Sequence, residues 1–98
     1  MGKFADLRRR TRRLIILKLL EACEGREANL DLIHAALPDE GVASSIDAVS
    51  ADLAWLDEQG LVNVREIEGV TFAKITTRGI DVAKDRAHVP GVERPGPQ

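Results

Sequence analysis

The sequence predicts a mainly helical α+β domain in which three helices are followed by a β-hairpin and a fourth helix. Apolar residues recur at helical spacing as far as Gln59, β-branched residues gather on both sides of Glu68-Gly69, and glycine or proline separates the periodic stretches. A chain of 98 residues with 44% hydrophobic content and 3% aromatic content suits one small, mainly aliphatic core.

A long first helix is expected from the N-terminus to the region of Gly25. It begins in the basic stretch FADLRRRTRR (residues 4–13) and continues through LIILKLLEAC (residues 14–23), where only Lys18 and Glu21 interrupt the apolar run. A helix that is apolar on more than one face is buried on more than one face. Such burial needs a central position in the fold or a second subunit, and we expect a homodimer that shares this helix.

A short second helix is expected over NLDLIHAAL (residues 29–37). Asn29 offers a side-chain oxygen to cap its first turn, and the apolar residues of the segment fall on one side. Pro38 and Gly41 follow directly and are expected to end it.

The third helix is expected to begin after Ser44 and to run to about Gln59. Asp47 follows Ser44 at the spacing of a capping box, and Gly60 can adopt the left-handed conformation that ends a helix. At about 100° per residue, one side of this helix is apolar and is expected to face the core. That side comprises Ile46, Val49, Leu53 and Leu56.

Two strands, a last helix and a tail complete the prediction. LVNVREI (residues 61–67) and VTFAKIT (residues 70–76) are expected to form the hairpin, and Thr76 should cap the helix TRGIDVAKDRA (residues 77–87). The end of the chain contains three of the four prolines and no apolar period. We therefore expect a domain over residues 1–88 and an extended or disordered tail over residues 89–98.

This order of elements is that of a winged helix-turn-helix. LAWLDEQGLV (residues 53–62) resembles the reading-helix end and first wing strand of MarR-, PadR- and ArsR-type bacterial regulators, and ITTRGIDVA (residues 75–83) resembles the exit from their wing. Together with the ending VPGVERPGP (residues 89–97), these segments resemble a family of small winged-helix proteins of Mu-like prophages. The resemblance implies a phage-derived, cytoplasmic DNA-binding protein that regulates transcription.

Several classes of protein are excluded by composition. No apolar run is long enough for a spanning helix, and the basic start lacks the features of a signal peptide. The single Cys23 can form neither an internal disulfide nor a paired thiolate site, and His34 and His88 lie far apart. No catalytic constellation is present, so we expect no enzyme activity, cofactor or metal.

The charges are strongly segregated, although the net charge is only −2. Residues 1–26 hold eight Lys or Arg against three Asp or Glu, whereas residues 27–64 hold eight acidic residues and no Lys or Arg. The basic run can follow a phosphate backbone but cannot encode a base sequence. A solvated or intersubunit ion-paired surface is the alternative. The candidate phosphate contacts are Arg8, Arg9, Arg10, Arg12, Arg13, Ser44, Ser45, Arg65 and Lys74.

The third helix lacks the side chains that read bases. Winged-helix regulators usually place Arg, Lys, Gln or Asn on this helix, because contacts to guanine and adenine need hydrogen-bond donors. A second hypothesis is therefore a protein-interaction module in which the acidic side of this helix docks a basic partner or another copy of the chain. Trp55 could pack within its own chain or anchor that partner. The candidate interface residues are Asp47, Ala48, Ala51, Asp52, Trp55 and Glu58.

Overall fold

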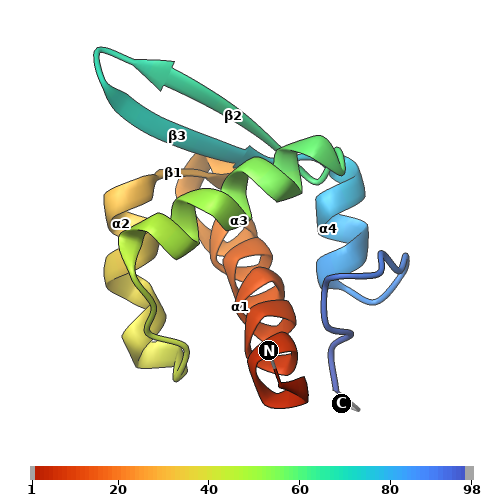
Figure 1. The fold of residues 1–98 in the computed structure, drawn as a ribbon. Coiled ribbons are helices and arrows are strands. Elements are labelled where there is room, and N and C mark those ends of the chain that lie inside the picture. Colours follow the sequence, from red (N-terminus) through yellow and green to blue (C-terminus); the bar gives the residue numbers. More distant parts are fainter. Residues whose placement is uncertain (1, 97–98) are drawn as a thin grey trace.

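A computed structural model describes residues 2–96 and confirms the predicted α+β winged-helix fold (Figure 1). Four α-helices pack together, a small antiparallel sheet lies at one end of them, and the β-hairpin projects from the body as the wing. The helices are α1 (Lys3–Ala22), α2 (Leu30–Ala36), α3 (Ile46–Glu58) and α4 (Thr77–Ala83). The strands are β1 (Glu27–Asn29), β2 (Val62–Ile67) and β3 (Val70–Ile75), and two 3₁₀ turns cover Glu24–Arg26 and Leu37–Glu40.

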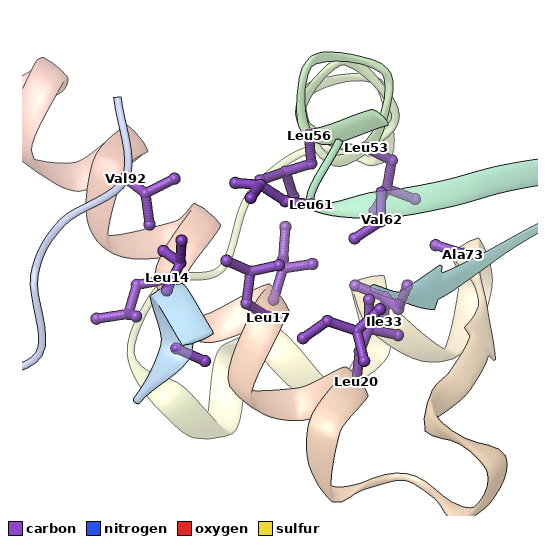
Figure 2. Close-up of a cluster of buried hydrophobic side chains, with 14 of the residues drawn as sticks. Leu14, Leu17, Leu20, Ile33, Leu53, Leu56, Leu61, Val62, Ala73 and Val92 are labelled. Carbon is purple, nitrogen blue, oxygen red and sulfur yellow. The ribbon is translucent and has the colours of Figure 1, made fainter. Parts of the chain in front are cut away.

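Helix α1 runs through the centre of the molecule and supplies the middle of the core (Figure 2). Ile16, Leu17 and Leu20 are fully buried, whereas Ile15 and Leu19 are only partly buried. The expected burial on more than one side is therefore found for the second half of α1. Helices α2, α3 and α4 and the sheet supply the covering residues within the same chain.

The predicted helix caps are confirmed for α2 and α4 but not for α3. The side chains of Asn29 and Thr76 accept hydrogen bonds from backbone N–H groups in the first turns of α2 and α4. Ser45, not Ser44, caps α3, with its hydroxyl oxygen accepting from the N–H of Ala48 at 3.1 Å. The one-residue shift leaves Ile46 in the first turn and substantially exposed, so its prediction as a core residue is wrong.

The sheet has one strand more than the sequence predicted. The order is β1-β3-β2, with both pairs antiparallel, so the predicted hairpin β2–β3 is confirmed and β1 is added at its other edge. Strand β1 has only three residues and follows the 3₁₀ turn directly. Too short to show an apolar alternation, it gains its structure by pairing with β3.

The C-terminal segment is packed, which differs from the disorder expected after residue 88. Val89 and Val92 are buried in the core, and the N–H of Glu93 donates to the carbonyl oxygen of Arg10 at 3.1 Å. The two valines anchor an otherwise irregular segment on the helices. Because two buried side chains are enough for this packing, the segment needs no periodic apolar pattern. Residues 97–98 of the expected tail lie outside the described residues.

The helices within residues 2–96 are either too short or too polar to cross a membrane.

Candidate functional site

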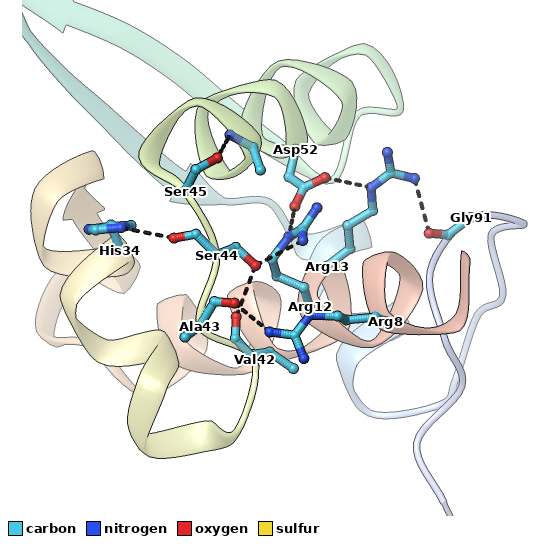
Figure 3. Close-up of polar contacts among 11 residues, drawn as sticks. Arg8, Arg12, Arg13, His34, Val42, Ala43, Ser44, Ser45, Asp52 and Gly91 are labelled. Atoms are coloured by element: carbon cyan, nitrogen blue, oxygen red, sulfur yellow. Dashed lines mark hydrogen bonds and ion pairs between the residues drawn. The ribbon is translucent and has the colours of Figure 1, made fainter. Parts of the chain in front are cut away.

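Two arginines of the basic run lie inside the protein and bind one carboxylate of α3 (Figure 3). Arg12 is 8% exposed and Asp52 is 2% exposed. The Nε atoms of Arg12 and Arg13 donate to different oxygens of Asp52, that of Arg13 at 3.0 Å. The carboxylate is thus shared between two guanidinium groups. We call Arg12, Arg13 and Asp52 the buried ion cluster.

The buried ion cluster also holds the C-terminal segment. Arg13 donates from Nη1 to the carbonyl oxygen of Gly91 at 3.2 Å, and its guanidinium carbon lies 4.0 Å from the centre of the Trp55 ring. Gly91 has φ 103°, and a Cβ atom at this position would lie 2.6 Å from the Trp55 ring. Of the two uses weighed for Trp55, the structure therefore shows packing within its own chain.

The other arginines of the run are closer to solvent, but each has an internal partner. Arg8 donates to the carbonyl oxygen of Ala43 in the turn before α3. Arg9 pairs with Asp6 on the same helix at 2.6 Å, and Arg10 pairs with Glu93 at 3.0 Å. Exposed pairs of this kind contribute at most about 1 kcal/mol each and can be exchanged for another anion.

The two serines before α3 have different roles. Ser44 accepts from Nη1 of Arg12 at 2.9 Å and donates to the carbonyl oxygen of Val42, so it belongs to the turn and the buried ion cluster. His34 Nε2 lies 3.0 Å from the carbonyl oxygen of Ser44 and ties α2 to the same turn. Ser45 is exposed and caps α3, which leaves it accessible to a ligand.

The two candidate cations of the wing strands differ. Arg65 of β2 reaches across β3 and pairs with Glu27 of β1 through two hydrogen bonds of 3.1 Å, and it lies 5.9 Å from the Phe72 ring centre. Lys74 is exposed and has no ion-pair partner within residues 2–96. Of the two residues, Lys74 is therefore the more available to a ligand.

The candidate interface residues of α3 lie on two different sides of the helix. Asp52 is buried, so it is not available to a partner, and Trp55 and Ala48 are partly buried on the side that faces the rest of the chain. The helical spacing predicted Asp52 on the outer side of α3, because only apolar residues were used to define the side that faces the core. Asp47, Ala51 and Glu58 are exposed as expected.

The exposed side of α3 and the tip of the wing each carry exposed carboxylates, and we consider the two sets of residues together. We call them the α3–wing face. The turn at the tip places Ile67 and Val70 in solvent beside two glutamates. None of the four carboxylates on this face has an ion-pair partner among the described residues. The face comprises Asp47, Ser50, Ala51, Ala54 and Glu58 of α3 and Glu66, Ile67, Glu68 and Val70 of the wing.

Two further features bear on chemistry. The described residues contain no cluster of three or more His, Cys, Asp or Glu side chains able to hold a metal ion. Hydrogen bonds from the Arg94 guanidinium lower the pKa of Asp85 below its ordinary value of 3.8. This pair fastens the C-terminal segment to the end of α4.

Gly91 and Glu93 were not predicted from the sequence as part of the site, because no spacing rule connects them to Arg13 and Arg10.

The comparisons with known proteins give a family. No protein-family model matches the chain. It is 41% identical over 93 residues to gp26 of Escherichia phage Mu, an uncharacterized protein, and the match covers 95% of this chain and 96% of gp26. An uncharacterized protein of Haemophilus influenzae is 36% identical over 76 residues, covering 76% of this chain and 74% of that protein. HlyU from Vibrio cholerae superposes with a TM-score of 0.47 and 22% identity over 88% of this chain and 92% of HlyU. The near full-length match shows that the chain belongs to the family of phage Mu gp26.

Proposed function

We propose that this chain is a phage-derived winged-helix protein that binds a basic protein partner through the α3–wing face. The charge of that face carries the proposal. Its carboxylates, Asp47, Glu58, Glu66 and Glu68, have no neutralising cation among the described residues, and residues 27–64 contain no Lys or Arg at all.

This charge opposes base reading by α3. A helix in the major groove lies between two phosphate strands that carry one negative charge per roughly 1.7 Å of duplex. The common specific contacts come from Arg, Lys, Asn and Gln, whereas a carboxylate can only accept a hydrogen bond. On α3 the exposed side chains are carboxylates, small residues and Ile46.

The basic run does not compensate for this charge. Arg12 and Arg13 approach α3 from its inner side, where they neutralise Asp52. They therefore stabilise the position of α3 and do not extend a basic surface across it. Arg12 and Arg13 therefore lie on the inner side of α3, away from its exposed carboxylates.

The α3–wing face has the features of a protein-binding surface. Exposed Ala51 and Ala54 allow a partner backbone to approach α3 closely, and Ile67 and Val70 offer apolar contact at the wing tip. Opposite charges across an interface accelerate association and select the partner. A protein segment that carries Lys or Arg around apolar residues fits this combination.

The experiment compares charge-reversed variants in capture of a partner from phage-producing cells. Asp47→Lys combined with Glu58→Lys should abolish capture of a basic protein. Asp31→Lys is the matched control, because Asp31 is an exposed acidic residue of α2 outside the face, and it should retain capture. Equal capture by both variants, with unchanged melting temperatures, would refute the proposal.

A second candidate function is binding to the DNA phosphate backbone without base selectivity, from which a role in transcription regulation would follow. It is favoured by the N-terminal end of α1, where Lys3, Arg8 and Arg9 are exposed, and by Lys74 and Ser45. Such binding should be micromolar or weaker and should fall steeply with salt. Arg8→Gln with Arg9→Gln should abolish it, and unchanged affinity in that variant would exclude these contacts. For either candidate function we propose a cytoplasmic location.

A further inference from the structure

We propose that two copies of the chain pair through the outer sides of their α1 helices, in antiparallel orientation, with Phe4 of each copy in an apolar pocket of the other. Phe4 is 79% exposed, and Leu7, one turn later, is also exposed. Large apolar side chains in solvent on a regular helix indicate a surface that a second molecule covers. This surface is separate from the α3–wing face.

One side of α1 carries a stripe of exposed and partly buried residues. Phe4, Leu7, Thr11, Ile15 and Ala22 follow one another at three, four or seven residues, which places them on one side of the helix. The opposite side is the one that the chain itself buries. Lys18 falls within the stripe, three residues after Ile15 and four before Ala22, and its aliphatic stem can cover apolar surface while its amine reaches water.

The stripe ends beside a pocket of about 210 Å³ that has no occupant from the described residues. Leu19 of α1 and Cys23, which follows α1 directly, line this pocket together with Leu32 of α2, which is 61% exposed. The remaining lining residues are Ala28, Ile33 and Ala36. An aromatic ring is the kind of side chain that such an apolar pocket accommodates.

Antiparallel pairing brings Phe4 to this pocket. If the twofold axis crosses α1 level with Arg13, residues whose numbers add to 26 lie opposite one another. Phe4 then meets Ala22, a large side chain against a small one, directly beside Leu19 and Cys23. The distance along α1 is sufficient, because its 20 residues span roughly 30 Å.

The charges of α1 favour the same orientation. Residues 3–13 contain six Lys or Arg and one Asp, whereas residues 14–24 contain Lys18 against Glu21 and Glu24. Parallel pairing would place the two basic halves side by side. Antiparallel pairing keeps the two basic halves apart and so avoids their mutual repulsion.

The first test is the oligomeric state in sedimentation equilibrium. The wild-type chain should be a dimer at micromolar concentration, and Phe4→Ser should weaken the association at least tenfold without changing the melting temperature of the monomer. Val70→Ser is the matched control, since Val70 is also an exposed apolar residue but lies on the wing. A wild-type monomer, or equal effects of the two substitutions, would overturn the proposal.

The second test uses the native Cys23 to determine the orientation. Phe4→Cys should form a disulfide-linked dimer on mild oxidation, because the thiol introduced into one copy meets Cys23 of the other. Within one chain the two positions are 19 residues and roughly 28 Å apart on a single helix, far beyond the reach of a disulfide. Phe4→Cys combined with Cys23→Ser should not cross-link. A wild-type dimer linked through Cys23 would instead show parallel pairing and overturn the proposal.

Discussion

Replacing Asp52 by Asn should strongly destabilise the fold. The substitution preserves the shape of the side chain but leaves Arg12 and Arg13 without a counter-charge in a site where Asp52 is 2% exposed. Removing one partner of a buried ion pair costs about 3–5 kcal/mol, a large part of the roughly 5–15 kcal/mol that stabilises a domain of this size. At about 4–8 °C per kcal/mol, the melting temperature should fall by roughly 12 °C or more.

The assay is thermal and urea unfolding followed by circular dichroism. Glu58→Gln is the matched control on the same helix, because Glu58 is exposed and without an ion pair in the described structure; it should change stability by at most about 0.5 kcal/mol. Replacing the whole cluster by Met, Met and Leu should recover most of the stability lost by Asp52→Asn. A fall of less than about 1 kcal/mol for Asp52→Asn would refute the claim that this cluster fixes α3 on α1.

Three further predictions concern the C-terminal segment. Deleting residues 89–98 removes two buried valines and should lower the free energy of unfolding by about 3 kcal/mol or more, measured by urea titration; an unchanged midpoint would contradict the packing of the segment. Gly91→Ala should cost about 1–3 kcal/mol, because its Cβ would lie 2.6 Å from the Trp55 ring, and a red shift of tryptophan fluorescence should report the displaced ring. The third prediction is a pH dependence. Because Arg94 lowers the folded-state pKa of Asp85, the pair stabilises the fold at pH values above the unfolded-state pKa of Asp85. This stabilisation is lost as the pH falls through the folded-state pKa, which lies below 3.8. The difference in melting temperature between wild type and Asp85→Asn should therefore shrink on acidification below pH 4, and a difference that grows would contradict the pairing.

The local elements could be predicted from the sequence because their signals are local. Asn29 and Thr76 cap the helices that the apolar spacing indicated, and the hairpin turns at Glu68-Gly69. Strand β1 could not be predicted, since three residues carry no alternation and its structure depends on pairing with β3. Propensity and spacing describe what a segment can form and not what it pairs with.

The candidate site was harder to predict because its decisive contacts join distant residues. Asp52 is 40 positions from Arg12 and 39 from Arg13, and a helical wheel treats all three as outward-facing. Each charge is acceptable inside the protein only because the others are there. The segregation of charge along the chain was compatible with two interpretations, a basic arm for nucleic acid or attraction between the basic and acidic surfaces, for example between subunits. The buried ion cluster shows that part of this attraction acts within one chain.

The most direct test of the account is DNA binding by the wild-type protein, measured by fluorescence anisotropy with several unrelated duplexes at about 50 mM and about 200 mM salt. If α3 does not read bases, the protein should show either no binding or weak binding that is equal for all duplexes and disappears at the higher salt. Ala51→Arg, which adds a cation to the α3–wing face, should increase the affinity for every duplex. Tight binding to one sequence that persists at the higher salt and is lost in Ala51→Arg would contradict the claim that α3 does not read DNA.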